Sequence, residues 1–213
     1  MQLLKSVSDS PAYHCALEAC FLAEHPAREV LLFYINRPSV IVGRNQCIEA
    51  EVDVAYCRSN GIEIVRRLSG GGTVYHDYGN INYAFITDKG LTPVLDTDFT
   101  VPVLAALQSF GIVTTVGIRK ELLVNGKKIS GTASHVTRDR VLFHGTLLHC
   151  TDFKRMSHAL QGNQALRGKK VASISSPVIN IADLTGTTES TAEFLGRLLN
   201  FFSAYYHVEP VEF

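Results

Sequence analysis

The chain has 213 residues, of which 46% are hydrophobic, and its 20 basic residues balance 20 acidic ones. This length supports one well-buried domain without disulfides, and a formal charge of zero gives no bulk case for nucleic acid or an anionic membrane as a partner. Five cysteines without a CxxC pair argue against a disulfide framework. No apolar run reaches the ~20 residues of a membrane helix, and the first residues lack a secretory signal. We therefore expect a cytoplasmic protein.

The N-terminal half is expected to combine helices with short strands. Ser10 followed by Pro11 is typical of a helix N-cap with proline at the first helical position, and Pro26 would end this helix. The remaining elements are read from apolar periodicity and turn residues. They are strands over 30–35 and 39–42, a polar loop over 43–46, a helix over 51–58, and strands over 62–65, 74–75 and 80–87.

The C-terminal half is predicted to contain a β-meander between helices. Asn125-Gly126 between two apolar runs is the strongest short hairpin signal in the chain. The predicted elements are a helix over 101–110, strands over 121–124, 128–133 and 141–150, a short helix from Asp152 to Leu160, a polar loop over 161–177 and a helix over 189–206. Hairpins with helices at their margins indicate an α+β fold with mixed, largely antiparallel sheets flanked by helices.

A glycine-rich loop between two predicted strands points to a ligand site. It reads Arg66-Arg67-Leu68-Ser69-Gly70-Gly71-Gly72-Thr73-Val74-Tyr75-His76-Asp77. Glycine lets a backbone approach a ligand closely, successive N–H groups in such a turn bind anions, and arginine matches carboxylate or phosphate. No Gly-Lys-Ser/Thr closes the loop as in a P-loop, and a strand follows it, unlike the dinucleotide fingerprint. The loop predicts a site for a small anion, with a solvated glycine-rich hairpin as the alternative.

Two further segments carry polar groups on predicted strands. Lys128 would share one strand face with Ser130 and Thr132, where its charge can stabilise a phosphate or carboxylate; a pair of solvated turn lysines, Lys127 and Lys128, is the alternative. In His144-Gly145-Thr146, the glycine indicates that something approaches the backbone closely. The acids near these segments, Glu63, Asp77 and Glu121, show no metal-ligand spacing, so the metal ligands stay unassigned.

Together these segments resemble lipoate–protein ligases and lipoyltransferases. The resemblance rests on the glycine loop, on Asn125-Gly126-Lys127-Lys128-Ile129-Ser130-Gly131-Thr132-Ala133, on His144-Gly145-Thr146-Leu147-Leu148, and on Val42-Gly43-Arg44-Asn45-Gln46. These motifs run in order over nearly the whole chain. The resemblance implies the α+β catalytic core shared with biotin–protein ligases.

In this family, lipoate and ATP give lipoyl-AMP with Mg²⁺, and a lysine of a lipoyl domain then attacks the anhydride. The acceptors implied are the lipoyl domains of 2-oxoacid dehydrogenase E2 subunits and the glycine cleavage H protein. Lys128 matches the catalytic lysine that touches the acyl carbonyl and the α-phosphate, and Lys169 and Lys170 fall in an adenylate-covering loop. The positions that match ligand-binding residues are Arg67, Ser69, Gly70, Gly71, Gly72, Thr73, Val74, Tyr75, His76, Lys128, His144, Gly145 and Thr146.

The sequence departs from the family pattern in two places. The chain stops at Phe213, where many bacterial ligases continue into an accessory domain, so we expect a single catalytic domain over 1–213 that uses a separate accessory-domain protein or transfers preformed lipoyl-AMP. Glu121 stands where the family often has aspartate. One alternative is an octanoyl- or lipoyl-transferase that uses a cysteine nucleophile, but no cysteine lies between Cys57 and Cys150. A non-catalytic lipoate- or carrier-binding protein is the other alternative.

Overall fold

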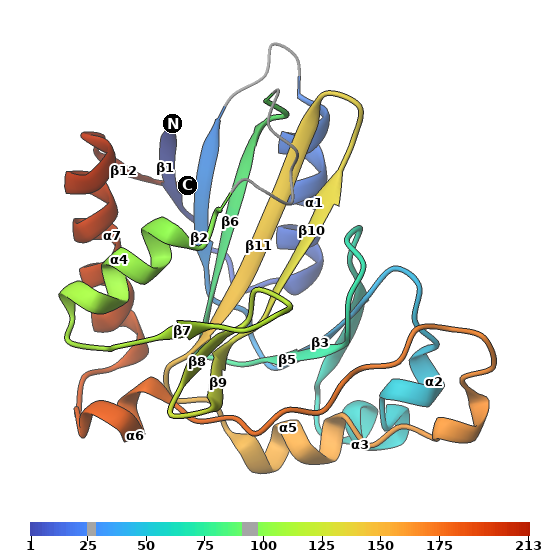
Figure 1. Cartoon of the computed structure of the whole chain (residues 1–213). Helices are drawn as coiled ribbons and strands as arrows, with labels where there is room; N and C mark the ends of the chain where they lie inside the picture. The colour runs from blue at the N-terminus through green and yellow to red at the C-terminus, as the bar shows by residue number, and fades with distance from the viewer. Residues whose placement is uncertain (25–28, 91–97) are drawn as a thin grey trace.

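A computed structural model describes residues 1–24, 29–90 and 98–213 of the chain. The described residues form three sheets (Figure 1). The strands of the main sheet are β1 (Gln2–Lys5), β2 (Val30–Tyr34), β6 (Asn80–Asp88), β10 (Thr132–Val136), β11 (Arg140–Leu148) and β12 (Pro210–Glu212). They lie in the order β10-β11-β6-β2-β1-β12, with β1 parallel to both of its neighbours and the other pairs antiparallel.

Helices cover both faces of the main sheet (Figure 1). Helix α1 (Pro11–Ala23) packs on one face, where Leu22 meets Val30, Leu32 and Ala84. Helices α4 (Val101–Ser109) and α7 (Thr191–Tyr206) cover the other face, over Leu31, Phe33 and Phe85. The strand residues alternate between the two cores because successive side chains of a strand point to opposite faces. The mixed α+β class predicted from the sequence is confirmed.

Two small sheets frame one end of the main sheet. The first consists of β3 (Ser39–Val42), β4 (Glu63–Arg66) and β5 (Val74–His76), and the second of β7 (Thr115–Val116), β8 (Leu122–Val124) and β9 (Lys127–Ser130). The first sheet packs on short helices through an apolar cluster that includes Val40, Cys57 and Ala159. The shorter helices of the fold are α2 (Ile48–Glu51), α3 (Val54–Ser59), α5 (Phe153–Ala159), the 3-10 turn η1 (Gln164–Leu166) and α6 (Ile181–Thr185).

Capping explains where several helices begin. Ser10 accepts a hydrogen bond from the Tyr13 amide at the start of α1, as predicted, and Asp152 caps α5 in the same way. The predicted helix over 51–58 was wrong in its extent, because the chain breaks at Val52 and restarts with Asp53 as a new N-cap. No helix in the described ranges is both long and apolar enough to cross a membrane.

The predicted meander over 121–150 was wrong in its topology. The hairpin at Asn125-Gly126 is present, and both turn residues have positive φ. However, the strand predicted over 128–133 ends at Ser130, and the chain enters the main sheet at Thr132. Gly131 is the hinge between the two sheets, and its amide donates to Thr146 Oγ1 at 3.1 Å. This break separates Lys128 from the strand that follows it.

Candidate active site

A cavity of about 380 Å³ opens on the α1 face of the main sheet. The main sheet forms its floor through Tyr34, Asn82 and Thr146, which lie in one row because Asn82 pairs in register with both of the others. Helix α1 and the glycine loop form its walls, and Lys128 and residues 171–174 border it on the other side. Segments between residues 15 and 174 therefore build one partly open cavity.

Most of the ligand residues predicted from the sequence line this cavity. Those that do are Arg67, Gly71, Gly72, Thr73, Val74, His76, Lys128, His144, Gly145 and Thr146. Ser69 is fully buried behind the wall, Gly70 lies outside the lining, and Tyr75 packs into the apolar cluster beneath β3. Ser130 also lies away from the cavity, 3.4 Å from the Tyr83 hydroxyl, so the predicted shared face of Lys128, Ser130 and Thr132 was wrong.

Arg67 organises the glycine loop. Its guanidinium donates to Ser69 Oγ at 2.8 Å, to the Ile41 carbonyl at 2.9 Å, and to the carbonyls of Gly70 and Gly72 at 2.6 and 2.7 Å. Arginine has five fixed N–H donors, and these four bonds use four of them within the protein. The primary action of Arg67 in this structure is to shape the loop.

A second set of bonds attaches residues 171–174 to the glycine loop. Ser173 Oγ accepts from the Thr73 amide at 2.9 Å and from Gln46 Nε2 at 3.0 Å. Gln46 Oε1 in turn accepts from the Gly43 amide and from Thr73 Oγ1. A Cβ added at Gly43 would collide with the Gly71 carbonyl, so this glycine permits the close approach of the two segments. The Gly43–Gln46 motif thus supports the loop from behind.

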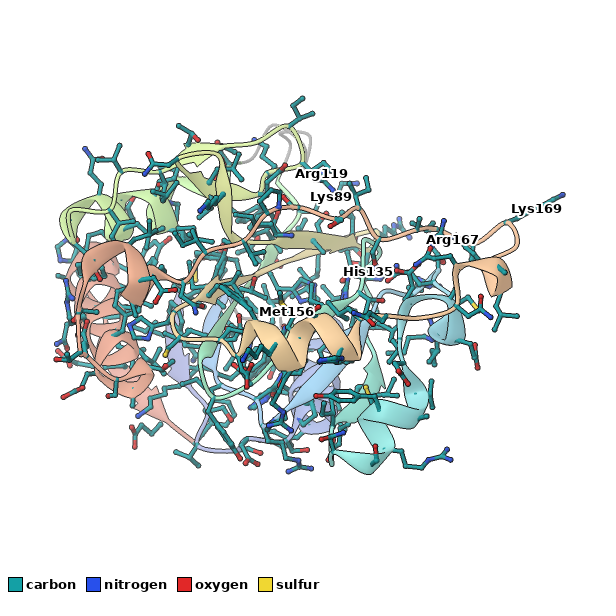
Figure 2. All side chains as sticks on the ribbon, turned by 90° about the horizontal axis from the view of Figure 1, so that it is seen from below. Lys89, Arg119, His135, Met156, Arg167 and Lys169 are labelled. Atoms are coloured by element: carbon teal, nitrogen blue, oxygen red, sulfur yellow. The ribbon has the colours of Figure 1, made fainter. Side chains whose placement is uncertain are left out.

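The lysines predicted to cover an adenylate do not line the cavity. Lys169 and Lys170 are exposed, and Lys169 points away from the body of the molecule, whereas Arg119 lies on a separate segment (Figure 2). The neighbouring residues Val171 and Ile174 are the part of the segment that borders the cavity.

Lys128 brings a positive charge into the cavity. A Cβ at Gly131 would lie 3.1 Å from Lys128 Nζ, so the missing side chain leaves room for the ammonium group. Within the described part of the chain, Nζ has no hydrogen bond or ion pair. Burial lowers the pKa of Lys128, nearby Arg119 lowers it further, and Glu121 opposes the shift. A half-buried cation without a partner among the described residues favours an anionic ligand.

The structure adds Glu18, which sequence reasoning missed. Its carboxylate is buried and accepts from Tyr34 Oη at 3.0 Å and from His144 Nδ1 at 2.9 Å, while Ser69 Oγ lies 2.7 Å from His144 Nε2. Ser69, His144 and Glu18 have the connectivity of a catalytic triad. Ser69 is nonetheless fully buried and also accepts from Arg67, so it does not serve as a nucleophile toward a ligand in the cavity.

A second buried polar chain holds His76. His14 Nδ1 donates to Asn36 Oδ1 at 2.6 Å, and Asn36 Nδ2 donates to His76 Nδ1 at 2.9 Å. Burial lowers the pKa of His76 to about 3, and the nearby Arg67, His144 and His14 lower it further. His14 and Glu18 are one helical turn apart on α1, and polar residues at this spacing in an apolar helix were the signal available in the sequence.

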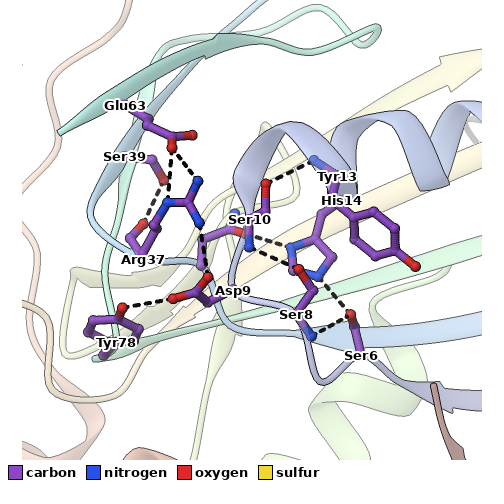
Figure 3. Close-up of polar contacts among 11 residues, drawn as sticks. Ser6, Ser8, Asp9, Ser10, Tyr13, His14, Arg37, Ser39, Glu63 and Tyr78 are labelled. Carbon is purple, nitrogen blue, oxygen red and sulfur yellow. Dashed lines mark hydrogen bonds and ion pairs between the residues drawn. The ribbon is translucent and has the colours of Figure 1, made fainter. Parts of the chain in front are cut away.

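The acids considered as metal ligands lie apart from one another. Glu63 pairs with Arg37, which also pairs with Asp9 (Figure 3). Asp77 accepts from the amides of Gly79 and Asp152. Only Glu121 lines the cavity, where it accepts from the Arg119 amide at 2.8 Å. The described residues contain no cluster of three metal-binding side chains.

The fold and the site define an α+β protein with a partly open, cation-bearing cavity suited to an anionic ligand. Residues 10–203 match the family model described as lipoyl protein ligase A/B catalytic domain. The chain therefore belongs to the lipoyl protein ligase A/B family, as its motifs predicted.

Known proteins similar to the chain include curated and solved ligases. The chain is 39% identical over 194 residues to lipoate-protein ligase LplJ of Bacillus subtilis. The aligned region covers 90% of this chain and 59% of that protein. A bi-partite lipoate protein ligase from Thermoplasma acidophilum, solved as part of a study with its E2 lipoyl domain, has a TM-score of 0.77 at 25% identity, covering 100% and 87% of the two chains. A lipoate-protein ligase A bound with ATP has a TM-score of 0.75 at 26% identity, again covering 100% and 87%. The chain thus spans about three fifths of the length of the curated relative.

Proposed function

We propose that this domain attaches lipoate to a lysine of lipoyl domains in an ATP-dependent reaction through lipoyl-AMP. The observation that carries the proposal is Lys128, an unpaired cation among the described residues, placed inside a cavity lined by the family's glycine loop. Family membership and the solved relatives named for lipoate ligation and for bound ATP support the same reaction.

The reaction consists of two balanced steps. A lipoate carboxylate oxygen attacks the α-phosphorus of ATP, the bond to the β-phosphate breaks, and pyrophosphate leaves. The ε-amine of the acceptor lysine then attacks the acyl carbon, an amide forms, the bond to AMP breaks, and a proton is released. Negative charge grows on the phosphate and the acyl oxygen in turn, and the Lys128 ammonium stabilises charge at both places.

The row across the sheet floor gives the cavity two ends. Lys128 adjoins Thr146 on β11, whereas Tyr34 on β2 lies two strands away, a separation of about 10 Å at the usual strand spacing. We place the carboxylate and the adenylate at the Lys128 end, and the acyl tail toward Tyr34 and Ile41. His144, Gly145 and Thr146 then border the chain between the two ends.

Magnesium fits this site as a partner of the nucleotide. Mg²⁺ is commonly held by one or two carboxylates together with substrate phosphates rather than by an all-protein cage. Glu121 supplies one carboxylate at the Lys128 end of the cavity. The bound ion would neutralise phosphate charge there.

The acceptors we propose are the lipoyl domains of 2-oxoacid dehydrogenase E2 subunits and the glycine cleavage H protein. The T. acidophilum relative, described with its E2 lipoyl domain, supports the first class. Its description as bi-partite supports a separate accessory-domain protein as a further partner. We also propose a cytoplasmic location, where these acceptors and ATP meet.

A cysteine-dependent acyl transfer is the less favoured alternative. Cys150 is exposed beyond β11 and does not line the cavity. Cys15 does line it, but burial raises the pKa of its thiol to about 12, so the thiolate needed for attack is scarce at neutral pH. Transfer from an octanoyl carrier protein that is abolished by Cys15→Ala or Cys150→Ala would establish this alternative.

Assays of the purified protein with lipoate, Mg²⁺ and ATP, with and without a lipoyl domain, test the proposal. Pyrophosphate release shows adenylation, and acceptor modification from synthetic lipoyl-AMP alone shows a transferase that receives its adenylate. We expect Lys128→Ala to lower kcat by about 100-fold or more, as for the loss of one preorganised donor. Lys127→Ala is the matched control, because this side chain is exposed on the hairpin. Equal losses in the two variants would refute the assignment.

A further inference from the structure

Helix α1 turns two ionisable side chains toward the protein interior. Its buried positions are Pro11, His14, Glu18 and Leu22, whereas Tyr13 and Cys20 on the apolar-looking side are exposed. Burying a carboxylate is costly unless it is paired and hydrogen-bonded. The bonds that Glu18 receives from Tyr34 and His144 offset this cost, and they link α1 to the cavity wall.

The bonds around His144 specify which ring nitrogen carries the proton. The Glu18 carboxylate only accepts, so His144 Nδ1 must donate to it across 2.9 Å. Arg67 Nε only donates, so Ser69 Oγ accepts from it across 2.8 Å, which leaves the hydroxyl hydrogen free to bond His144 Nε2 across 2.7 Å. In a neutral ring the bond to Glu18 therefore selects the tautomer with hydrogen on Nδ1 and a bare Nε2, and the Ser69 hydroxyl can donate to that nitrogen.

The same bonds extend into the glycine loop. Ser69 orients Arg67 Nε, and Arg67 Nη2 holds the carbonyls of Gly70 and Gly72. Four consecutive links thus connect a carboxylate on α1 with the backbone that walls the cavity. Glu18, Ser69 and Arg67 are all buried, so these bonds are shielded from bulk water, although Glu18, Arg67 and His144 also border the cavity.

We propose that Glu18 is a positioning residue that holds His144 in its Nδ1–H tautomer and, through Ser69 and Arg67, sets the shape of the glycine loop for its anionic ligand. Glu18 does not touch the reacting atoms in this proposal. The kinetic part rests on the proposed ligase function, whereas the tautomer and the loop order are properties of the ligand-free protein.

Nitrogen-15 NMR of the histidine rings tests the tautomer directly, with His144→Asn identifying the signal. We expect a bare Nε2 and a protonated Nδ1 in the wild type. In Glu18→Leu we expect a mixture of tautomers and about 10-fold faster hydrogen exchange of the Thr73 amide, which donates to Ser173 Oγ in the wild type. A 10-fold change corresponds to losing about 1.4 kcal/mol of hydrogen-bond stabilisation. Glu209→Leu makes the same substitution at an exposed glutamate and should change neither signal.

Glu18→Gln removes the charge and replaces one oxygen by an amide NH2, but it keeps one oxygen at the position of Oε1, which lies within hydrogen-bond distance of both Tyr34 Oη and His144 Nδ1. We expect Glu18→Gln to restore the single tautomer and most of the protection of the Thr73 amide from hydrogen exchange. We expect Glu18→Leu to raise the KM for lipoate about 10-fold with a smaller change in kcat. Glu18→Gln should return this KM toward the wild-type value. A wild-type ring with hydrogen on Nε2 would overturn the proposal, as would unchanged exchange of the Thr73 amide in a folded Glu18→Leu. If the wild type lacks ligase activity, the proposed function fails while the NMR and exchange measurements still decide this inference.

Discussion

Replacing Gly145 by alanine tests why a glycine stands in the middle of β11. The sequence indicated a close neighbour at this position, and the neighbour is the ring of Tyr83 on β6, directly opposite in register. A Cβ at Gly145 would lie 2.5 Å from Tyr83 Cζ and 3.0 Å from Cε1. Ordinary carbon contacts lie near 3.5–4.0 Å, so the ring must move by about 1 Å.

The expected cost follows from the surroundings of Tyr83. Its ring is fully buried, packs edge-on against Phe85, and has its hydroxyl 3.4 Å from Ser130 Oγ. Overpacking a tight core typically costs about 1–3 kcal/mol, and losing the hydroxyl contact adds about 1 kcal/mol. We therefore expect Gly145→Ala to lower the free energy of unfolding by about 2–4 kcal/mol.

Urea unfolding followed by far-UV circular dichroism measures this change, since the chain has no tryptophan. Gly196→Ala is the matched control: nothing lies within 4 Å of its added Cβ in α7, and it should stabilise the protein by about 0.5–1 kcal/mol. Tyr83→Leu should reduce the cost of Gly145→Ala in a double-mutant cycle by at least about 1 kcal/mol. A stable Gly145→Ala that loses ligand binding would refute the reasoning and assign the glycine to a ligand.

Two pH dependences follow from the lowered pKa values of His76 and Lys128. The unfolded chain binds a proton on His76 near pH 6.5, but the folded chain binds it only near pH 3, so this histidine stabilises the fold above pH 6.5 and loses that contribution as the pH falls. Relative to His76→Gln, the wild type should lose about 1.4 kcal/mol of unfolding free energy per pH unit below about pH 6. Urea unfolding at about pH 7, 6 and 5 measures this loss. If the unfolding free energies of the two proteins change with pH in parallel, the ring of His76 is not held neutral by burial. Lys128 must be protonated to hold an anion and its pKa is lowered, so lipoate binding by calorimetry should weaken with rising pH earlier than for an ordinary lysine. Lys128→Arg should abolish that alkaline loss, and its persistence would assign the titration to another group.

Much of the local structure could be read from residue patterns. Ser10-Pro11 and Asp152 begin helices where their side chains satisfy free amide groups, and Asn125-Gly126 forms its turn because both residues adopt positive φ. These features depend on neighbours a few residues away. The glycine loop and Lys128 were found for the same reason, since their chemistry lies in contiguous motifs.

The arrangement of polar groups around the cavity required the folded chain. Glu18 meets His144 across 126 positions of sequence, and Ser69 meets His144 across 75. The His14–Glu18 spacing places both residues on one face of α1, but no local pattern shows which distant residues Glu18 contacts. Whether a buried carboxylate is tolerated depends on the donors that distant strands bring to it.

Tertiary packing also gives three residues of the motifs partners within the protein that the sequence did not reveal. The loop carbonyls engage Arg67, the Tyr83 ring explains Gly145, and the β-bulge in the β8–β9 pairing directs Ser130 toward Tyr83 while Lys128 borders the cavity. The residue types follow from local chemistry, but their partners depend on how three sheets meet at one end of the molecule. Thus the motifs identify the family, and the packing shows which of their side chains line the cavity and which support the wall behind it.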